Sequence, residues 1–192
     1  MNRLLIIGPP GAGKGTQAVK IAEALSIPAI STGDIFRKNI KEETELGKEA
    51  KSYIDSGNLV PDSVTNNMVR ARLAEEDTAN GFLLDGYPRN TAQVHELDAI
   101  LADKGEKVER VLLLVADNDE LVARLLNRAA EQGRTDDNEE VIRHRLNVYA
   151  EETAPLLELY RERGIVKEID GLGEIAEVTE RLLDALDRKS VV

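Results

Sequence analysis

The sequence predicts an α/β fold in which a five-stranded parallel sheet lies between two layers of helices, a three-layer sandwich. Short apolar runs alternate with amphipathic helical segments along the 192 residues. Strands that are apolar on both faces are typical of a parallel sheet covered by helices on both sides. Turns rich in Gly and polar residues directly follow several of these runs. In such folds ligands bind at the carboxyl ends of the strands.

The N-terminal third predicts two strands, each followed by a helix. The first strand covers Leu4 to Ile7, and an amphipathic pattern follows from Gln17 to Leu25. A second strand is expected over residues 27–30, and residues 31–34 form a turn with helix-capping chemistry. Residues 35–56 are helical in pattern but offer few apolar side chains to bury, which indicates a small mobile lobe.

The remaining elements continue the alternation. Asp62 or Ser63 is expected to cap a helix that runs to about Glu75. The expected strands are 82–85, 108–115 and 165–169, and the expected helices are 91–101, 117–128, 138–163 and 174–186. Pro155 should end or kink the long helix. The polar segment 129–137 has no apolar face and indicates a break.

The stretch from Gly8 to Thr16 reads GPPGAGKGT and lies between a strand and a helix. This context is the one that a phosphate-binding P-loop requires. The glycines let several backbone N–H groups point at one anion, the helix start adds its positive dipole end, and Lys14 adds a charge. Gly15 stands where Ser or Thr is usual, and Thr16 follows one position later. The predicted fold is therefore of the P-loop NTPase type.

Composition narrows the class of protein. A net charge of −11 disfavours a general nucleic-acid or anionic-membrane surface. The absence of Cys excludes disulfides, thiolate zinc sites and Cys nucleophiles. No apolar stretch approaches the length of a membrane span, and Met1 leads straight into the first strand. A cytoplasmic protein that does not bind nucleic acid is expected.

Arginines gather near the expected ligand edge of this acidic chain. Such side chains clamp phosphates and neutralise charge on a transferring phosphoryl group. Asp85 ends a strand, where it could hold Mg²⁺ through water or simply cap the next turn. Because Gly15 stands where a metal-contacting hydroxyl is usual, we expect the protein to give Mg²⁺ few direct ligands. Nucleotide phosphates and water would then supply most of its coordination. The arginines concerned are Arg37, Arg89, Arg124, Arg128, Arg134 and Arg145.

The sequence offers no candidate catalytic base. His95 and His144, the two histidines, both fall on predicted helices away from the site and are expected on the surface. An acceptor that is itself a phosphate is already ionised near neutral pH, so it needs no base before it attacks. The lack of a base therefore favours a phosphate acceptor.

These motifs together resemble the adenylate kinases of the nucleoside monophosphate kinase family. The matching pieces are GPPGAGKGTQ (8–17), STGDIFR (31–37), GNLV (57–60), LLDGYPRN with Gln93, Arg128 with GRTDD (133–137), and TAPLLELY (153–160). The resemblance implies a P-loop core of residues 1–30, 61–126 and 138–192. It also implies an AMP-binding lobe over 31–60 and a short lid over 127–137, the compact lid type that binds no zinc.

The resemblance also implies roles for individual residues. The Mg-ATP site would include Gly11, Ala12, Gly13, Lys14, Gly15, Thr16, Arg124, Arg128 and Gly173, and Asp136 and Asp137 would anchor lid arginines. The AMP site would include Thr32, Arg37, Asn58, Leu59, Val60, Gly86, Tyr87, Pro88, Arg89, Gln93, Arg134 and Arg145. The catalytic side chains would be Lys14, Arg89, Arg128, Arg134 and Arg145. The implied activity is reversible phosphoryl transfer from ATP to AMP, giving two ADP, by a monomer.

Two alternatives stay open. Asn90 after Gly-Tyr-Pro-Arg resembles UMP/CMP kinases, whereas Thr32 and Gln93 favour AMP, because a Gln amide can both donate to and accept from adenine. A nucleotide-binding switch without phosphoryl transfer is the second alternative. A guanine-reading Asn-Lys-x-Asp motif, which a GTPase switch would need, does not occur in the chain.

Overall fold

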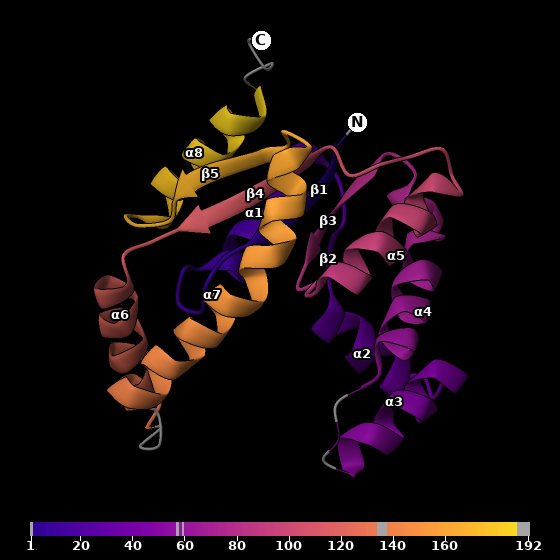
Figure 1. Cartoon of the computed structure of the whole chain (residues 1–192), viewed down its shortest axis with the longest axis horizontal. Helices are drawn as coiled ribbons and strands as arrows, with labels where there is room; N and C mark the ends of the chain where they lie inside the picture. The colour runs from indigo at the N-terminus through magenta and orange to yellow at the C-terminus, as the bar shows by residue number, and fades with distance from the viewer. Residues whose placement is uncertain (1, 57, 59, 134–137, 188–192) are drawn as a thin grey trace.

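The computed structural model describes residues 2–56, 58, 60–133 and 138–187. Its sheet is parallel throughout, with the strand order β2-β3-β1-β4-β5. Figure 1 shows the sheet at the centre of the molecule, with helices on both of its faces. The predicted α/β sandwich is confirmed. The strands are β1 (Asn2–Ile7), β2 (Ala29–Ser31), β3 (Gly81–Asp85), β4 (Arg110–Val115) and β5 (Val166–Asp170).

The helices alternate with the strands as expected, although several bounds differ from the prediction. Those in the first half of the chain are α1 (Lys14–Leu25), α2 (Thr32–Lys41), α3 (Glu45–Asp55), α4 (Asp62–Leu73), the 3₁₀ turn η1 (Glu76–Thr78) and α5 (Thr91–Ala102). Those in the second half are α6 (Asn118–Glu131), α7 (Glu139–Glu162) and α8 (Ile175–Asp187).

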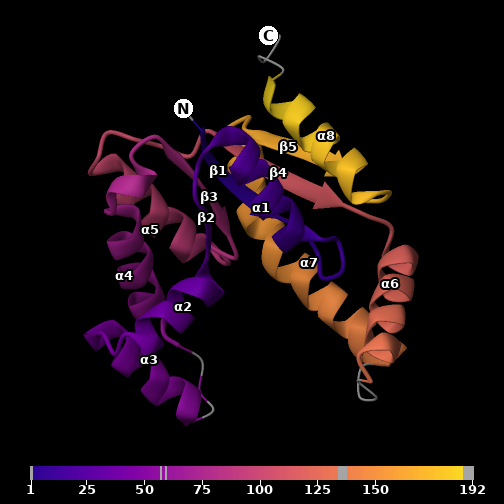
Figure 2. The same cartoon turned by 180° about the vertical axis from the view of Figure 1, so that it is seen from behind.

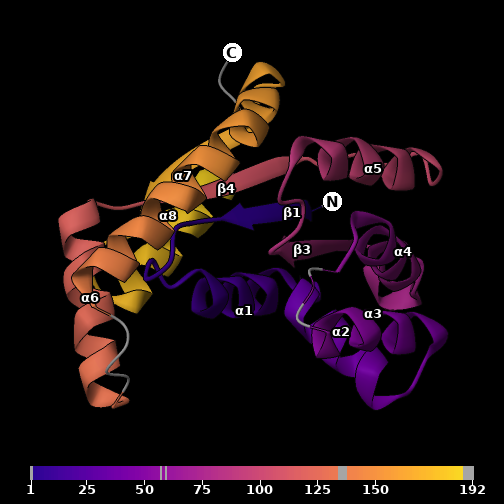
Figure 3. The same cartoon turned by 60° about the horizontal axis from the view of Figure 1, so that its bottom comes forward.

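Side-chain alternation along the strands divides the core into two clusters. Leu4 and Ile6 point to the face covered by α1 and α8, where Ile21 and Leu182 are buried. Leu5 points to the opposite face, which α5 and the C-terminal half of α7 cover. Figures 2 and 3 show these two helix layers. Two apolar faces on each central strand explain why the strand sequences are apolar without alternation.

The segment 35–56, which the sequence predicts to be helical in pattern, is largely helical in the structure. The segment contains two helices, α2 and α3, with Glu43 at a positive φ of 52° between them. Thr44 caps α3, because its Oγ1 accepts from the backbone N–H of Gly47 at 3.0 Å. The same hydroxyl donates to Asn39 Oδ1 at 2.7 Å. The positive φ of Glu43 therefore interrupts the helical run, and Thr44 begins the second helix.

Two expectations were wrong at the ends of helices. Pro61, not Asp62 or Ser63, stands at the N-cap position of α4. The predicted break at Ala129 begins later, because α6 continues to Glu131 with Ala129 buried. Of the two effects expected of Pro155, it does not end α7, which runs on to Glu162, close to the expected end at residue 163. Proline removes only one backbone donor, and the buried side chains that follow it keep the last turns packed.

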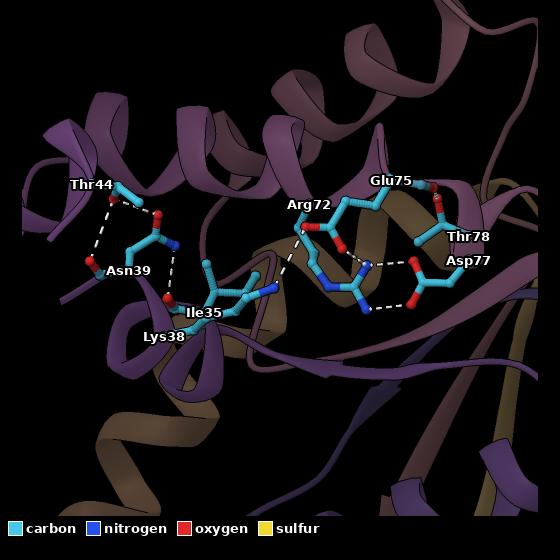
Figure 4. Close-up of polar contacts among 8 residues, drawn as sticks. All are labelled: Ile35, Lys38, Asn39, Thr44, Arg72, Glu75, Asp77 and Thr78. Carbon is cyan, nitrogen blue, oxygen red and sulfur yellow. Dashed lines mark hydrogen bonds and ion pairs between the residues drawn. The ribbon is translucent and has the colours of Figure 1, made fainter. Parts of the chain in front are cut away.

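Ionic contacts join α2 to the end of α4 (Figure 4). Lys38 on α2 lies 3.8 Å from Glu75, and Glu75 accepts from Arg72 at 2.9 Å. Arg72 also binds both oxygens of Asp77, at 2.7 and 2.8 Å. Thr78 donates to the backbone oxygens of Leu73 and Glu75, each at 2.8 Å. This polar cluster fixes the turn after α4, against which the start of the α2–α3 segment rests.

None of the helices in the described part of the chain has the length and apolar character needed to cross a bilayer.

Candidate phosphate and nucleotide site

The glycine-rich loop connects β1 to α1 in a conformation that exposes backbone N–H groups. Gly11 and Gly13 adopt positive φ values of 86° and 78°, which glycine alone tolerates readily. Gly13 is the N-cap of α1, and no side chain in the described part of the chain caps this helix. Its first backbone donors therefore remain available to an anion, with the helix dipole behind them. The P-loop geometry expected from the sequence is present.

Lys14 and Asp85 form an ion pair that brings the loop and the end of β3 together. Their side chains are 29% and 15% exposed, so the pair is partly shielded from water. Gly15 lies beside them, and a Cβ at this position would be 4.0 Å from Asp85 Oδ2. The adjacent strands β1 and β3 align Ile6 with Asp85, which places the acid next to the loop. The lysine thus lies at the carboxyl edge of the sheet.

Two side chains at this edge of the sheet carry oxygen atoms of the kind that bind a hard cation. The Asp85 carboxylate and the Thr16 hydroxyl are the kinds of ligand that Mg²⁺ accepts. Within the described residues, no three His, Cys, Asp or Glu side chains gather as a metal-binding group. A magnesium ion here would take its other ligands from phosphates and water.

A cavity of about 560 Å³ opens between the loop, the turn after β3 and α7. This volume is in the range of small-molecule sites. Cationic side chains enter it from four elements or turns: Lys14 from α1, Arg89 from the β3–α5 turn, Arg128 from α6 and Arg145 from α7. The fold therefore assembles four cations of a −11 protein around one space, where they suit a polyphosphate.

Other predicted residues that line this cavity belong to the loop or to the turn after β3. They are Gly11, Gly13, Gly15, Thr16, Gly86, Tyr87 and Pro88. Ala12, in contrast, is buried in the core, because its methyl group packs with the apolar residues under the loop.

One face of α7 lines the cavity although the sequence analysis did not select it, apart from Arg145. Two sets of residues spaced four apart predict that this face is continuous, because residues four apart share one face of a helix. They are Arg145, Tyr149 and Thr153, and Val148, Glu152 and Leu156. Burial raises the pKa of Tyr149 to about 12, although a hydrogen bond with Thr153 acts in the other direction. The phenol therefore stays protonated at neutral pH and is a hydrogen-bonding group without charge.

The turn after β3 is held by hydrogen bonds from both sides. Gly86 has a φ of 87°, and a Cβ on it would lie 2.9 Å from Thr32 Oγ1. Its carbonyl oxygen accepts from Arg89 Nε at 3.0 Å and from Thr32 Oγ1 at 3.5 Å. The backbone N–H of Arg89 donates to Gln93 Oε1 at 2.7 Å. Thr32, Arg89 and Gln93 thus converge on one turn.

Tyr87 in the same turn is buried, and its hydroxyl donates to Asn66 Oδ1 at 2.8 Å. Burial raises the pKa of this phenol above its ordinary value, so the hydroxyl remains a donor. The Tyr87–Pro88 peptide bond is cis.

Several predicted site residues lie outside the cavity. Arg37 is exposed and pairs with Asp34, and its hydrogen bond lowers the pKa of that carboxyl. Arg124 is half-buried on α6. Gly173 follows β5 with a φ of 116°, and Arg181 donates to the adjacent Leu172 carbonyl oxygen at 2.6 Å.

The turn expected at residues 57–60 is described only in part. The backbone N–H of Asn58 donates to the carbonyl oxygen of Tyr53 at 2.9 Å, and Val60 packs against the core. Leu59, Arg134, Asp136 and Asp137 lie outside the described residues.

Three further residues lie away from the cavity. Asp117 follows β4 and caps α6, its carboxylate accepting from the Glu120 backbone N–H at 3.3 Å. His95 and His144 are exposed on α5 and α7, as predicted.

Comparisons with known proteins agree with this architecture. The adenylate kinase family model matches residues 6–165. The adenylate kinase of Kocuria rhizophila is 68% identical over 188 residues, covering 98% of this chain and all of the relative. That of Clavibacter michiganensis subsp. michiganensis is 60% identical over 191 residues, covering all of this chain and 96% of the relative. That of Thermobifida fusca is 57% identical over 188 residues, covering 98% of this chain and all of the relative. Because the family model matches most of the fold built around the P-loop and these relatives cover nearly the whole chain, the chain belongs to the adenylate kinase family.

Proposed function

We propose that the chain transfers the γ-phosphoryl group of Mg-ATP reversibly to AMP, giving two ADP. The observation that carries the proposal is the convergence of Lys14, Arg89, Arg128 and Arg145 on one cavity beside the P-loop. Membership of the adenylate kinase family supports it further. ATP, AMP and ADP are then the partners. A monomer in the cytoplasm, without nucleic-acid or membrane partners, completes the proposal.

The chemistry of phosphoryl transfer assigns a role to each group in the site. A phosphate oxygen of AMP attacks the γ-phosphorus of ATP, and the bond to the bridging oxygen of ADP breaks. The acceptor oxygen is already ionised, so no base is needed. Lys14 and the P-loop N–H groups hold the donor phosphates, while the arginines neutralise charge that builds up during transfer. When bound, Mg²⁺ would supply further neutralisation of the phosphates, and Asp85 would hold it through water.

The mobile parts carry over from the family resemblance. We assign residues 31–60 to the AMP-binding lobe and 127–137 to the lid over ATP, with Arg134 in the lid bridging the two nucleotides. Thr32, Arg37, Asn58, Leu59, Val60 and Gln93 complete the AMP site in this proposal, and Arg124 and Gly173 lie by the ATP adenine. Closure of both lobes excludes water and so suppresses ATP hydrolysis.

A UMP/CMP kinase is not favoured. Asn90, the residue that pointed to those enzymes, has a local structural task as the N-cap of α5, where its Oδ1 accepts from the Gln93 backbone N–H at 2.8 Å. The relatives compared above are all named adenylate kinases. A nucleotide-binding switch would leave the four cations around one cavity unexplained.

A coupled assay with ATP and a panel of AMP, UMP, CMP and dTMP tests the acceptor. We expect AMP to give the highest kcat/KM, and ATP hydrolysis without an acceptor to be slow. A higher kcat/KM for UMP or CMP would overturn the acceptor assignment. Fast hydrolysis without an acceptor would count against closure of the lobes.

Arg128→Ala tests the arrangement around the donor. Since Arg128 lines the cavity from α6, its loss should impair the use of ATP more than the use of AMP. Arg161→Ala is the matched control, because Arg161 is exposed near the end of α7 and pairs with Glu168. An unchanged kcat and KM for ATP in Arg128→Ala would remove this residue from the site.

A further inference from the structure

Asp62 connects two helices beside the turn that follows β3. It is the first residue of α4, and its Oδ1 accepts from Gln93 Nε2 on α5 at 3.0 Å. Its Oδ2 accepts from Asn90 Nδ2 at 3.2 Å. Neither contact is needed to begin α4, because both reach across to residues 28 and 31 positions away. The carboxylate is therefore placed to act on Gln93.

Asp62 and Arg89 hold the Gln93 amide in one orientation. The backbone N–H of Arg89 donates to Gln93 Oε1 at 2.7 Å, and Asp62 accepts from Nε2 on the other side. A backbone N–H can only donate, and an ionised carboxylate can only accept. A rotation of the amide by 180° would set oxygen against carboxylate and N–H against N–H. Gln93 is 5% exposed, so water cannot readily replace either lost contact.

The orientation of an amide determines which base edge it can read. A primary amide has two N–H donors and two acceptor lone pairs, and the contacts above occupy one of each. The remaining pair matches adenine, whose amino group donates and whose N1 accepts. Hypoxanthine has these roles reversed, with an oxygen acceptor and an N1–H donor. A freely rotating amide could serve either base, whereas a fixed one favours only one of them.

We propose that Asp62 is a positioning residue that sets acceptor specificity. By fixing the Gln93 amide, it favours 6-aminopurine over 6-oxopurine monophosphates. This inference rests on the proposed function, in which AMP binds beside Gln93. Cytosine presents the same donor and acceptor order as adenine, so the relevant competitor is IMP, which differs from AMP only at this edge.

Asp62→Asn tests the proposal, because an amide at position 62 can face Gln93 in either orientation. We expect the ratio of kcat/KM for AMP to that for IMP to fall about tenfold, the effect of losing one hydrogen bond to a charged group. The ratio is measured on one preparation and does not depend on how much of the enzyme is folded. Asp62→Ser, which keeps a residue suited to a helix start, should lower the ratio as well.

Asp103→Asn is the matched control. It makes the same chemical change and removes another α4 contact, the ion pair of Asp103 with Arg70 at 2.9 Å, but leaves Gln93 untouched. Its AMP to IMP ratio should equal that of the wild type. An unchanged ratio in Asp62→Asn and Asp62→Ser would overturn the proposal.

A double-mutant cycle separates a positioning role from a general structural one. Gln93→Ala alone should lower the AMP to IMP ratio. If Asp62 acts through Gln93, then adding Asp62→Asn to Gln93→Ala should not change the ratio further, and a further fall would contradict the proposal. Failure of the proposed function itself would appear differently, as a wild-type chain that does not phosphorylate AMP.

Discussion

Lys14 takes part in three features of the site. It begins α1, it pairs with Asp85 at the end of β3, and it lines the cavity that the arginines enter. Its ammonium group therefore lies where the P-loop amides and the sheet edge meet. Partial burial limits the screening of its charge by water, so its effect on a bound phosphate is larger than that of a surface lysine.

Lys14→Met should lower kcat by about 10²-fold or more, because it removes a charge that stabilises the transferring phosphoryl group. The KM for AMP should change much less. Steady-state kinetics with varied ATP and AMP measures both. Lys20→Met is the control, since Lys20 is exposed on the same helix. A kcat within a few-fold of the wild type would show that Lys14 is not part of the chemistry.

Helices α2 and α3 cross so closely that only glycine fits at the contact. A Cβ on Gly47 would lie 2.1 Å from the backbone oxygen of Asn39 and 2.4 Å from its carbonyl carbon. Backbone atoms cannot move aside as the end of a flexible side chain can. The angle between the two helices therefore depends on this glycine.

Gly47→Ala should destabilise the α2–α3 segment by about 1–3 kcal/mol, the usual cost of overpacking. Because the segment belongs to the proposed AMP lobe, the KM for AMP should rise while the KM for ATP stays near the wild-type value. Amide hydrogen exchange across residues 32–55 and the two KM values measure this. Ser52→Ala, exposed on the same helix, is the control. Equal exchange in Gly47→Ala and the wild type would contradict the steric argument.

The turn after α4 should give stability that depends on pH. Hydrogen bonds from Arg72 hold the pKa of Asp77 below its ordinary value of 3.8. For a carboxyl with a lowered pKa, the stabilisation is present above the ordinary value and is lost as the pH falls through the folded value. Figure 4 shows the two terminal nitrogens of the Arg72 guanidinium bound to the Asp77 carboxylate.

Asp77→Asn should therefore lower the free energy of unfolding at pH 7, and by a smaller amount at a pH below 3.8. The difference at pH 7 should be at most about 1 kcal/mol, because the Asp77 side chain is 50% exposed and water screens the pair. Urea unfolding of both proteins at the two pH values measures it. A difference that is equally large at the lower pH would mean that Asp77 acts through something other than its charge.

The whole molecule combines an acidic surface with a cationic cavity. A net charge of −11 would repel nucleotides at long range, whereas four cationic side chains line the cavity where α1, α6, α7 and the turn after β3 meet. Binding should thus be confined to one region of the chain, and magnesium, which lowers the charge of ATP, should assist the approach.

Removal of metal should separate catalysis from folding. Excess EDTA should abolish phosphoryl transfer. The Tm of the nucleotide-free protein should stay within about 1 °C of its value without EDTA, because a chain without Cys has no thiolate site for a structural metal that would contribute to folding. Differential scanning calorimetry and the coupled assay measure the two effects, and added Mg²⁺ should restore transfer. A clear fall in Tm on chelation would reveal a structural metal.

Local patterns carried much of the prediction. Apolar periodicity predicts the order of strands and helices along the chain. The chemistry of glycine, lysine and arginine points to the P-loop and to the arginines of the site. Both kinds of signal extend over only a few neighbouring residues. Errors arose where local signals competed. Pro61 took the N-cap position of α4 in place of Asp62 or Ser63, and α6 continued past the buried Ala129 to Glu131.

The sequence by itself determined the parallel α/β fold, the phosphate loop and the family resemblance, because each depends on short-range pattern and residue type. Only the tertiary structure decided the strand order, the face of α7 that lines the cavity, and the contact of Asp62 with Gln93. These depend on how distant elements pack and on which way each buried side chain then points. Hydrogen-bond geometry is sensitive to tenths of an ångström, and only packing across the whole core defines it at that scale.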